Sequence, residues 1–370
     1  MRICSPQLGI APNSTLGGEV YDREVLAQFA KLGNDVEILL PKLRPFDKSI
    51  KKFHVEFAPI KIIFPAYLYS LIIIPYLFRK YRQTKFDLLR IHVHFLAFGA
   101  LFFKLFHPNV PVVAHYHLDE DGFTFNAVNK FFLPRCELVI ADSFYLKQKL
   151  ITKFGLKEEK VKVVHCGTDL NIKPGPKDPK IQRKYNLKNK TVFIYMGRLI
   201  PRKRPDFLVE VFVEVHKKNP NTALIIFGQG SLETEIKEIV QKYGLEKSVF
   251  LLGTTFGEEK IRFYNTSDAF VFPSVNEGFV LVVLEALAAG LPVLASKAVS
   301  FGEAVENGAN GYLIDPNDKS EWVKKMLELA TNKTLCIKMG KRSRNIAVER
   351  FSWKQAAVNN LKYYKQLTDD

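Results

Sequence analysis

The chain contains few cysteines: four among 370 residues, Cys4, Cys136, Cys166 and Cys336, with no two of them in a CxxC pair. Their number and spacing exclude a disulfide framework and a zinc ribbon, and they fit a reducing compartment. The chain also lacks low-complexity segments, repeats with a period of about 20–50 residues, and the long apolar N-terminal run of a signal peptide. We therefore expect a globular, cytoplasmic protein that folds without disulfides or a structural metal.

Acidic residues are outnumbered by basic ones, 38 against 54, which gives a net charge of +16. Such a charge suits nucleic acid, an anionic membrane surface or phosphorylated substrates. No motif of an RNA- or DNA-binding domain accompanies the charge, so we expect no nucleic-acid partner. Hydrophobic residues (47%) and charged residues (25%) are at the levels of an ordinary globular protein, and the length predicts about two domains.

Short apolar runs alternate with segments of helical periodicity in both halves of the chain. Continuous apolar strands separated by helices indicate parallel sheets covered on both faces. The predicted strands are Val36–Leu40, Val55–Ile60, Asp87–Ile91, Val110–His115, Leu138–Ala141 and Val161–His165, then Val192–Met196, Ala223–Phe227, Val249–Leu252, Ala269–Phe272, Val293–Ala295 and Tyr312–Ile314.

This pattern predicts an α/β protein with two doubly wound, Rossmann-like domains that face each other across a cleft. We expect the first domain over residues 1–167, a proline-containing linker over 168–190, and the second domain over 191–350. A helix within 351–370 is expected to pack back on the first domain. In this architecture the ligand site lies at the carboxyl ends of the strands, hence in the cleft.

The stretch from residue 272 to 293 is the most informative. A loop holding Glu277 and Gly278 follows a strand, and a helix is expected to begin near Phe279. Glycine lets backbone approach a ligand, and the free N–H groups of a helix start suit a diphosphate. Glu285 lies among apolar residues, where an idle charge would be costly, so the two glutamates could hold separate hydroxyls of a nucleotide-sugar. The alternative is an acid at the helix start and a solvated helix residue.

A basic loop and a glycine pair add to this interpretation. Arg198 and Lys203 follow a strand, and fixed cations there could stabilise a departing nucleoside diphosphate without a metal; the alternative is a solvated basic loop. Gly17 and Gly18 open a helix at Glu19 and would let phosphate or sugar approach the backbone. Their spacing is not GxGxxG, which argues against a nicotinamide cofactor, and a plain turn is the alternative.

Four histidines, His92, His94, His115 and His117, cluster near two predicted strand ends. The two HxH pairs lack the further spaced ligand that a metal site needs, so we expect no metal. Residues 119–121 form a DxD sequence away from the diphosphate motifs. We interpret it as a solvated or acceptor-contacting loop.

These motifs resemble glycosyltransferase family 4, a large retaining family with the GT-B fold. The resemblance covers nearly the whole chain: the glutamate pair in EGFVLVVLEALAAGLPV, the Gly-Gly loop, the histidine of PVVAHYH, the basic pair and the glycine loop FGQGS. It implies that Glu277 contacts the donor sugar, Glu285 holds the ribose, and Arg198 and Lys203 stabilise the leaving diphosphate. It implies catalytic residues His117, Arg198, Lys203 and Glu277, and donor-binding residues Gly17, Gly18, Gly278, Phe279, Val280, Leu281 and Glu285.

Two positions depart from the family pattern. Arg204 stands where relatives usually have glycine, and Val280 where they often have a smaller residue or proline. An extra cation at residue 204 could strengthen phosphate binding or face water. The larger side chain at Val280 leaves undecided how the donor sugar would fit there.

The resemblance implies a retaining hexosyltransferase that moves a sugar from GDP-mannose or a UDP-hexose to a hydroxyl of a glycan or lipid-linked acceptor, in cell-envelope glycan biosynthesis. No cofactor or metal is expected, because the nucleotide-sugar is a substrate. The alternatives are a non-catalytic relative that binds nucleotide-sugars, and a GT-B epimerase or phosphorylase.

Residues 41–104 hold twelve Lys and Arg against three acidic residues, an excess of nine positive charges. The block contains the apolar run 62–78, interrupted by two prolines, which we interpret as one buried or interfacial helix rather than a membrane span. One hypothesis is that the acceptor-side first domain attaches to an anionic membrane surface. The other is a core helix with charges that only favour solubility. The membrane hypothesis names Lys48, Lys51, Lys52, Arg79, Lys80, Arg82 and Lys85 with Tyr67, Leu68, Leu71, Ile72 and Phe78.

Overall fold

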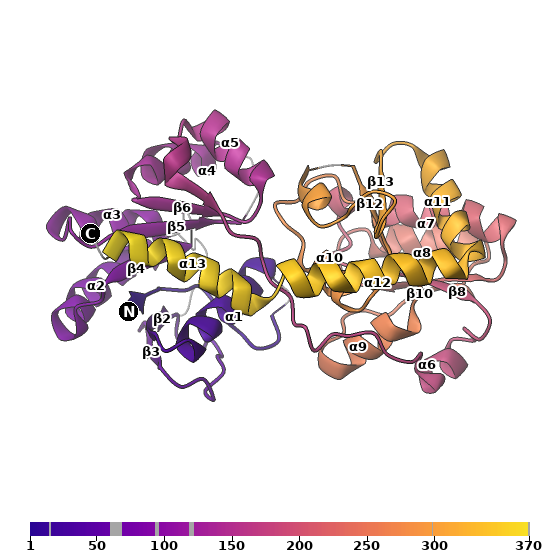
Figure 1. Ribbon diagram of the computed structural model, residues 1–370, viewed down its shortest axis with the longest axis horizontal. Helices are drawn as coiled ribbons and strands as arrows, with labels where there is room; N and C mark the ends of the chain where they lie inside the picture. The colour runs from indigo at the N-terminus through magenta and orange to yellow at the C-terminus, as the bar shows by residue number, and fades with distance from the viewer. Residues whose placement is uncertain (15, 60–68, 93–95, 118–121, 298, 369–370) are drawn as a thin grey trace. The chain divides into compact units, whose positions relative to one another are not determined.

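The computed structural model describes residues 1–14, 16–59, 69–92, 96–117, 122–297 and 299–368. Internal contacts divide this chain into two compact units (Figure 1). Unit 1 consists of Met1–Gly167 together with Trp353–Asp370, and unit 2 consists of Thr168–Ser352. The sequence crosses from the first unit to the second and returns, so the C-terminal segment belongs with the N-terminal one.

Unit 1 is built on a seven-stranded parallel sheet in the order β3-β2-β1-β4-β5-β6-β7. Most of its strands are buried on both faces, as continuous apolar runs predict. The strands are β1 (Arg2–Cys4), β2 (Asp35–Leu40), β3 (Phe53–Phe57), β4 (Leu88–His92), β5 (Val112–Tyr116), β6 (Leu138–Ala141) and β7 (Val161–Val163).

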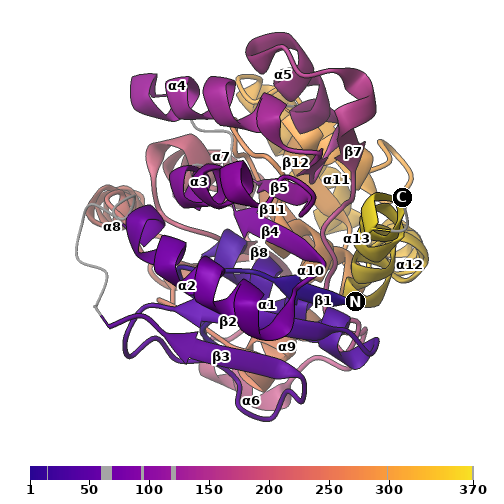
Figure 2. The same cartoon turned by 90° about the vertical axis from the view of Figure 1, so that its left-hand side faces the viewer.

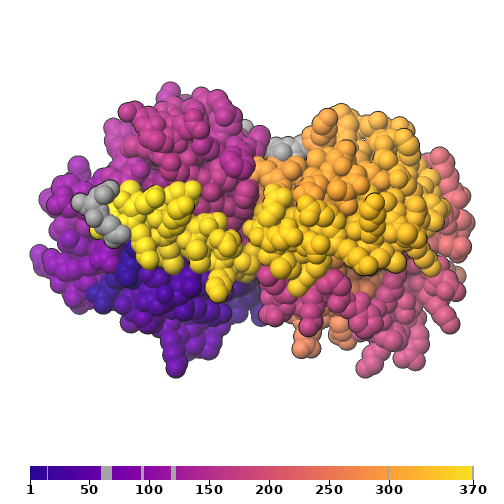
Figure 3. All heavy atoms as spheres, viewed as in Figure 1, coloured from indigo at the N-terminus to yellow at the C-terminus, as the bar shows by residue number. Residues whose placement is uncertain are grey.

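The helices of unit 1 form two groups. Helix α1 (Gly17–Lys31) contacts the C-terminal helix α13 (Trp353–Thr368), which covers part of the unit in the space-filling view (Figure 3). Along the chain, helices α2, α3, α4 and α5 contact one another in turn and bury a common apolar core against the sheet (Figure 2). They span Tyr69–Thr84, Ala97–Phe106, Phe123–Phe132 and Phe144–Phe154.

Unit 2 repeats the design with six parallel strands in the order β10-β9-β8-β11-β12-β13. The strands are β8 (Thr191–Met196), β9 (Thr222–Phe227), β10 (Val249–Leu251), β11 (Ala269–Phe272), β12 (Val293–Ser296) and β13 (Gly311–Ile314). The helices are α6 (Pro179–Lys184), α7 (Pro205–Lys218), α8 (Glu233–Lys242), α9 (Gly257–Thr266), α10 (Leu281–Ala288), α11 (Lys319–Thr331) and α12 (Lys333–Arg350).

Residues 168–190, predicted as a linker, include a helix and belong to unit 2. Asp178 caps α6 by accepting hydrogen bonds from the backbone N–H groups of Lys180 and Ile181. The guanidinium of Arg344 donates hydrogen bonds to the carbonyls of Leu170 and Ile172. The segment is therefore fixed to α12 of unit 2.

Helix α2 differs from the helix predicted over residues 62–78. It continues to Thr84 with Pro75 inside it, and residues 60–68, with Tyr67 and Leu68, lie outside the described chain. Lys80 is buried and paired with Glu37 (2.8 Å) and Glu56 (3.0 Å), so it cannot meet a membrane. Among the described residues, we find no helix whose length and hydropathy would let it cross a bilayer.

Candidate active site

His117 comes directly after β5, at the carboxyl edge of the first sheet, and is buried. Its Nδ1 donates a hydrogen bond to Oδ2 of Asp142 (2.5 Å). The other ring nitrogen, Nε2, is buried without a hydrogen-bond partner among the described residues. Burial lowers the pKa of His117, against the opposing effect of Asp142. The neutral ring then keeps an unshared pair on Nε2 that can accept a hydrogen bond from a substrate hydroxyl.

His92, at the end of β4, connects His117 with the glycine pair. The ring centroids of His92 and His117 are 4.6 Å apart. A Cβ built on Gly18 would lie 3.2 Å from Cε1 of His92, so glycine permits this close approach, while Gly17 is exposed at the start of α1. The structure thus brings three predicted site residues, Gly17, Gly18 and His117, to one edge of the sheet. His92 lies between them, and the sequence indicates no role for it.

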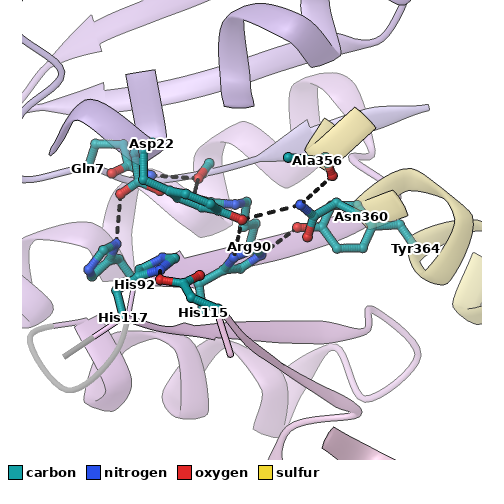
Figure 4. A network of polar contacts seen from close by, with 12 residues as sticks. Gln7, Asp22, Arg90, His92, His115, His117, Ala356, Asn360 and Tyr364 are labelled. Carbon is teal, nitrogen blue, oxygen red and sulfur yellow. Dashed lines mark hydrogen bonds and ion pairs between the residues drawn. The ribbon is translucent and has the colours of Figure 1, made fainter. Parts of the chain in front are cut away.

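Asp22, His92 and His117 offer ligand atoms that all lie within 4.8 Å of one another (Figure 4). Asp22, however, pairs with the buried Arg90 (2.5 Å) and accepts from Nδ1 of His92 (2.7 Å). Burial opposes its ionisation, but Arg90 and His92 hold the pKa of Asp22 below its usual range. A permanent guanidinium charge beside the cluster disfavours a cation, so the residues present do not suit a metal. The absence of a metal requirement stays a prediction.

His115 is part of the buried core of unit 1. It is fully buried in β5, and its Nε2 lies 2.6 Å from the hydroxyl of Tyr364 in α13 (Figure 4). Burial lowers its pKa well below the usual histidine value, so it is neutral. His94 and the DxD sequence at 119–121 lie outside the described residues.

In unit 2, Glu277 and Lys203 form a buried ion pair. Glu277 lies after β11 and Lys203 after β8, so neighbouring parallel strands deliver both to the same sheet edge. Arg202 approaches the same carboxylate at 3.2 Å, and Ser274 Oγ donates a hydrogen bond to it (2.7 Å). Burial lowers the pKa of Lys203, and Glu277 opposes that shift. The two charges neutralise each other here, and each could turn to a ligand of the opposite sign.

Arg198 lies in the loop after β8, and its side chain is exposed. Its carbonyl accepts a hydrogen bond from the Tyr195 hydroxyl (3.0 Å). The loop is braced by the next glycine loop: a Cβ on Gly228 would lie 1.8 Å from the Gly197 carbonyl oxygen, and one on Gly230 would lie 2.2 Å from that of Leu199. Two backbones therefore pack directly on each other, which explains the FGQG sequence in physical terms.

Glu285 is held by two residues that the sequence analysis missed. Its carboxylate oxygens lie 2.7 Å from Nζ of Lys260 and 2.9 Å from the hydroxyl of Tyr264, which donates to it. Both partners come from α9, more than twenty residues earlier, where no local pattern marks them. Glu285 is therefore not an idle charge among apolar residues, and its side chain stays 19% exposed.

Helix α10 begins at Leu281, two residues later than predicted, which places Glu285 about one turn inside it rather than two. Val280 is the N-cap residue and makes no side-chain cap. The N–H of Val283 already donates to the Val280 carbonyl (3.1 Å), so an anion could be bound only by the N–H groups before it in the first turn. Gly278 and Val280 are buried, and Phe279 is half-buried with its ring 5.9 Å from that of Phe351.

Arg204 adopts a left-handed backbone conformation, with φ of 53°, the conformation for which glycine is suited. Its guanidinium donates a hydrogen bond to the Pro316 carbonyl and lies 4.1 Å from the centre of the Phe207 ring. The side chain is thus bound to protein groups while it stays partly exposed, and its contact with a phosphate stays a prediction.

Comparison with known proteins gives two consecutive family matches. Residues 16–172 match the model described as Glycosyltransferase Family 4, and residues 177–346 match Glycosyl transferases group 1. The chain is similar to the D-inositol 3-phosphate glycosyltransferase of Corynebacterium jeikeium, with 29% identity over 246 residues, 64% of this chain and 58% of that protein. For seven of the curated relatives, the chain spans between 51% and 64% of their own length.

Solved structures share the whole fold. Sucrose-phosphate synthase from Thermosynechococcus elongatus superposes with a TM-score of 0.83 at 21% identity, over 99% of this chain and 98% of that chain. HepE from Anabaena, solved in complex with UDP and glucose, gives a TM-score of 0.80 at 20% identity, over 99% and 100%. The predicted GT-B fold class is confirmed.

Proposed function

Because the chain belongs to glycosyltransferase family 4, we propose that it is a retaining hexosyltransferase that uses a UDP- or GDP-linked sugar. The acceptor would be a hydroxyl of a glycan or of a lipid-linked sugar, as in the assembly of cell-envelope glycans. The relative named D-inositol 3-phosphate glycosyltransferase supports glycosyl transfer, and the HepE structure with UDP and glucose supports a nucleotide-sugar donor.

The observation that carries this proposal is the buried pair of Glu277 and Lys203. A nucleoside diphosphate brings negative charge and its sugar brings hydroxyls. Lys203 would leave the carboxylate for the phosphate, and Glu277 would then accept hydrogen bonds from the sugar. Exchanging one buried partner for another keeps both groups satisfied, whereas removing either one alone would leave an uncompensated charge.

The proposed reaction breaks the bond between the sugar C1 and the diphosphate oxygen, and forms a bond from C1 to the acceptor oxygen on the same face. The acceptor proton passes to the departing phosphate oxygen, so no side-chain base is needed. Arg198, Lys203 and the N–H groups at the start of α10 would stabilise the negative charge that builds on the leaving group. Glu285, positioned by Lys260 and Tyr264, would accept hydrogen bonds from the ribose hydroxyls.

Unit 1 would supply His117 to a hydroxyl of the donor sugar and backbone at Gly17 and Gly18 to the donor. The unpartnered Nε2 of His117 supports this role, because a buried acceptor without a hydrogen bond is costly until a ligand satisfies it. We also place the reaction in a reducing compartment, in keeping with four free thiols, and on the cytoplasmic side of the membrane if the acceptor is a lipid.

Two measurements test the proposal. A thermal-shift screen of UDP-, GDP- and ADP-sugars should give one base that raises the Tm by mass action. The anomeric configuration of the product, read by proton NMR, should be α from an α-linked donor, and a β-linked product would reject retention. Binding without transfer to any acceptor would favour a non-catalytic relative, and isomerised or phosphorolysed donor would favour an epimerase or a phosphorylase.

A further inference from the structure

Four successive helices of unit 1 contain no acidic residue. Helices α2, α3, α4 and α5, with the short helix η3 (Leu133–Arg135), carry nine Lys or Arg and no Asp or Glu. Helix α1 of the same unit has three acidic residues in fifteen. Four of the nine basic residues form ion pairs with acids outside these helices: Arg79 and Lys80 with Glu56, Lys104 with Glu137 and Lys147 with Glu158. The positive charge of the outer side therefore comes from the other basic residues, of which Arg82, Lys130 and Arg135 are exposed.

The same helices expose large apolar side chains. Helix α3 buries Ala100 and Phe103 in the core, yet its outer side carries Phe98 (58% exposed), Leu105 (78%) and Phe106 (61%). A helix that is apolar on both sides is normally covered on both sides. Six of the eight exposed phenylalanines among the described residues lie on three of these helices: Phe98, Phe102, Phe106, Phe123, Phe131 and Phe144.

The apolar and basic side chains are interleaved on neighbouring helices. Each helix in the series contacts the next (Figure 2). The ring of Phe78 on α2 lies 6.3 Å from that of Phe102 and 5.5 Å from that of Phe106, both on α3. The guanidinium of Arg135 lies 3.8 Å from the centre of the Phe131 ring. We call this surface the α2–α5 face.

We propose that the α2–α5 face docks on an anionic lipid bilayer, with Phe98, Leu105 and Phe123 entering the interface and the basic side chains meeting lipid phosphates. Charge complementarity selects this occupant. A second copy of the chain would bring the exposed Arg82, Lys130 and Arg135 of one face against those of the other, and like charges brought together cost free energy. The proposed docking on the bilayer does not depend on whether the acceptor is a glycan or a lipid-linked sugar. It therefore goes beyond the proposed reaction and does not rest on it.

The test is co-sedimentation of the full chain with vesicles of phosphatidylcholine alone, or mixed equally with phosphatidylglycerol. We expect binding to the anionic vesicles at low salt and release at high salt. Arg82→Gln and Lys130→Gln should each weaken partitioning roughly fivefold. Leu105→Ser with Phe123→Ser should weaken it further without unfolding, because both side chains are exposed, 78% and 90%.

A matched control is available on α12 in unit 2. Ile337 is 60% exposed and Lys338 is exposed, so Ile337→Ser with Lys338→Gln should leave vesicle binding unchanged. A reporter variant, Phe123→Trp, should shift its emission to the blue with anionic vesicles, and Ile337→Trp should not. If the Ile337→Ser, Lys338→Gln control lost as much vesicle binding as the variants of the α2–α5 face, the proposal that this face docks on the bilayer would be rejected.

Three further outcomes would overturn the proposal. The first is no binding to anionic vesicles at low salt, and the second is binding to nucleic acid in place of vesicles. The third is a dimer, seen by sedimentation velocity, that dissociates when Leu105→Ser and Phe123→Ser are introduced. Vesicle binding needs neither donor nor acceptor, so its failure would leave the proposed transferase function untouched, and a failure of transfer would leave the docking intact.

Discussion

Oδ2 of Asp142 accepts a hydrogen bond from Nδ1–H of His117, with 2.5 Å between the two atoms. The ring proton is then on Nδ1, and Nε2 of the buried ring has neither a proton nor a hydrogen-bond partner among the described residues. A residue after β6 thereby sets the tautomer of a residue after β5. We regard Asp142 as a positioning residue, because in the proposed mechanism it acts on the sugar through His117.

Replacing Asp142 with Asn should lower kcat/KM by roughly tenfold to a hundredfold, the worth of one hydrogen bond to a charged group. The pH profile separates positioning from a structural role. Burial already lowers the pKa of His117 below 6.5, so the neutral ring and the activity should persist below pH 6.5 in the native enzyme. Asp142 raises that pKa, so its loss should move the acid limb to still lower pH. An unchanged acid limb would contradict this role.

Lys203→Ala should lower kcat by roughly a hundredfold to a thousandfold, the loss found when one group that stabilises developing negative charge is removed. Because burial lowers the pKa of Lys203, activity should decline on the alkaline side before the ordinary lysine value of 10.5. Lys203→Arg should shift that limb upward, since guanidinium stays charged. Lys237→Ala, on the exposed outer side of α8, serves as the control and should change neither quantity.

Glu285→Ala should raise the Kd of the nucleotide-sugar roughly tenfold to a hundredfold, because hydrogen bonds to a carboxylate are lost. It should also cost about 1–3 kcal/mol of stability, since Lys260 and Tyr264 lose their partner. Tyr264→Phe keeps the carboxylate and removes one hydrogen bond, so we expect it to lower the Tm with a smaller effect on Kd. Calorimetric titration with the nucleotide that the screen identifies measures both variants, and equal changes in Kd would argue against a ribose contact.

Much of the fold can be predicted from the sequence. Strands such as β8 and β9 are buried on both faces, so their sequences are unbroken apolar runs, which can be identified without knowledge of distant contacts. The placement of Glu277 in a loop and of Glu285 in the helix that follows could likewise be predicted, because the two residues lie close together in the chain; their roles stay a prediction.

What escaped prediction depends on contacts between distant segments. Lys260 and Tyr264 reach Glu285 from another helix, and Asp142 reaches His117 from another strand, so no spacing along the chain reveals them. The direction of the Arg204 side chain is set by the loop at residues 316–317. Partnerships of this kind arise only when the parallel strands bring their carboxyl ends together.

Arg204→Gly should leave kcat and KM close to native values, because the side chain binds the Pro316 carbonyl and the Phe207 ring. Its effect on stability should be small, since the left-handed backbone strain that it relieves, about 1–2 kcal/mol, offsets the lost contacts. Arg204→Ala keeps the strain and loses the contacts, so its Tm should be lower than that of Arg204→Gly. A large rise in KM for the donor in both variants would show that Arg204 contacts the phosphate.

Gly230→Ala should damage catalysis without touching a catalytic side chain. Its Cβ would lie 2.2 Å from the Leu199 carbonyl oxygen, which is backbone and cannot rotate away, so the loop that carries Arg198 must shift. Displacement of a stabilising cation by about 1 Å can lower the rate a hundredfold. Gly302→Ala is the matched control, because its Cβ would meet only a Leu313 methyl at 3.7 Å. We expect a reduced kcat with a folded protein by circular dichroism for Gly230→Ala, and native kinetics for the control. Native kinetics in both variants would mean that the brace between the two loops does not position Arg198.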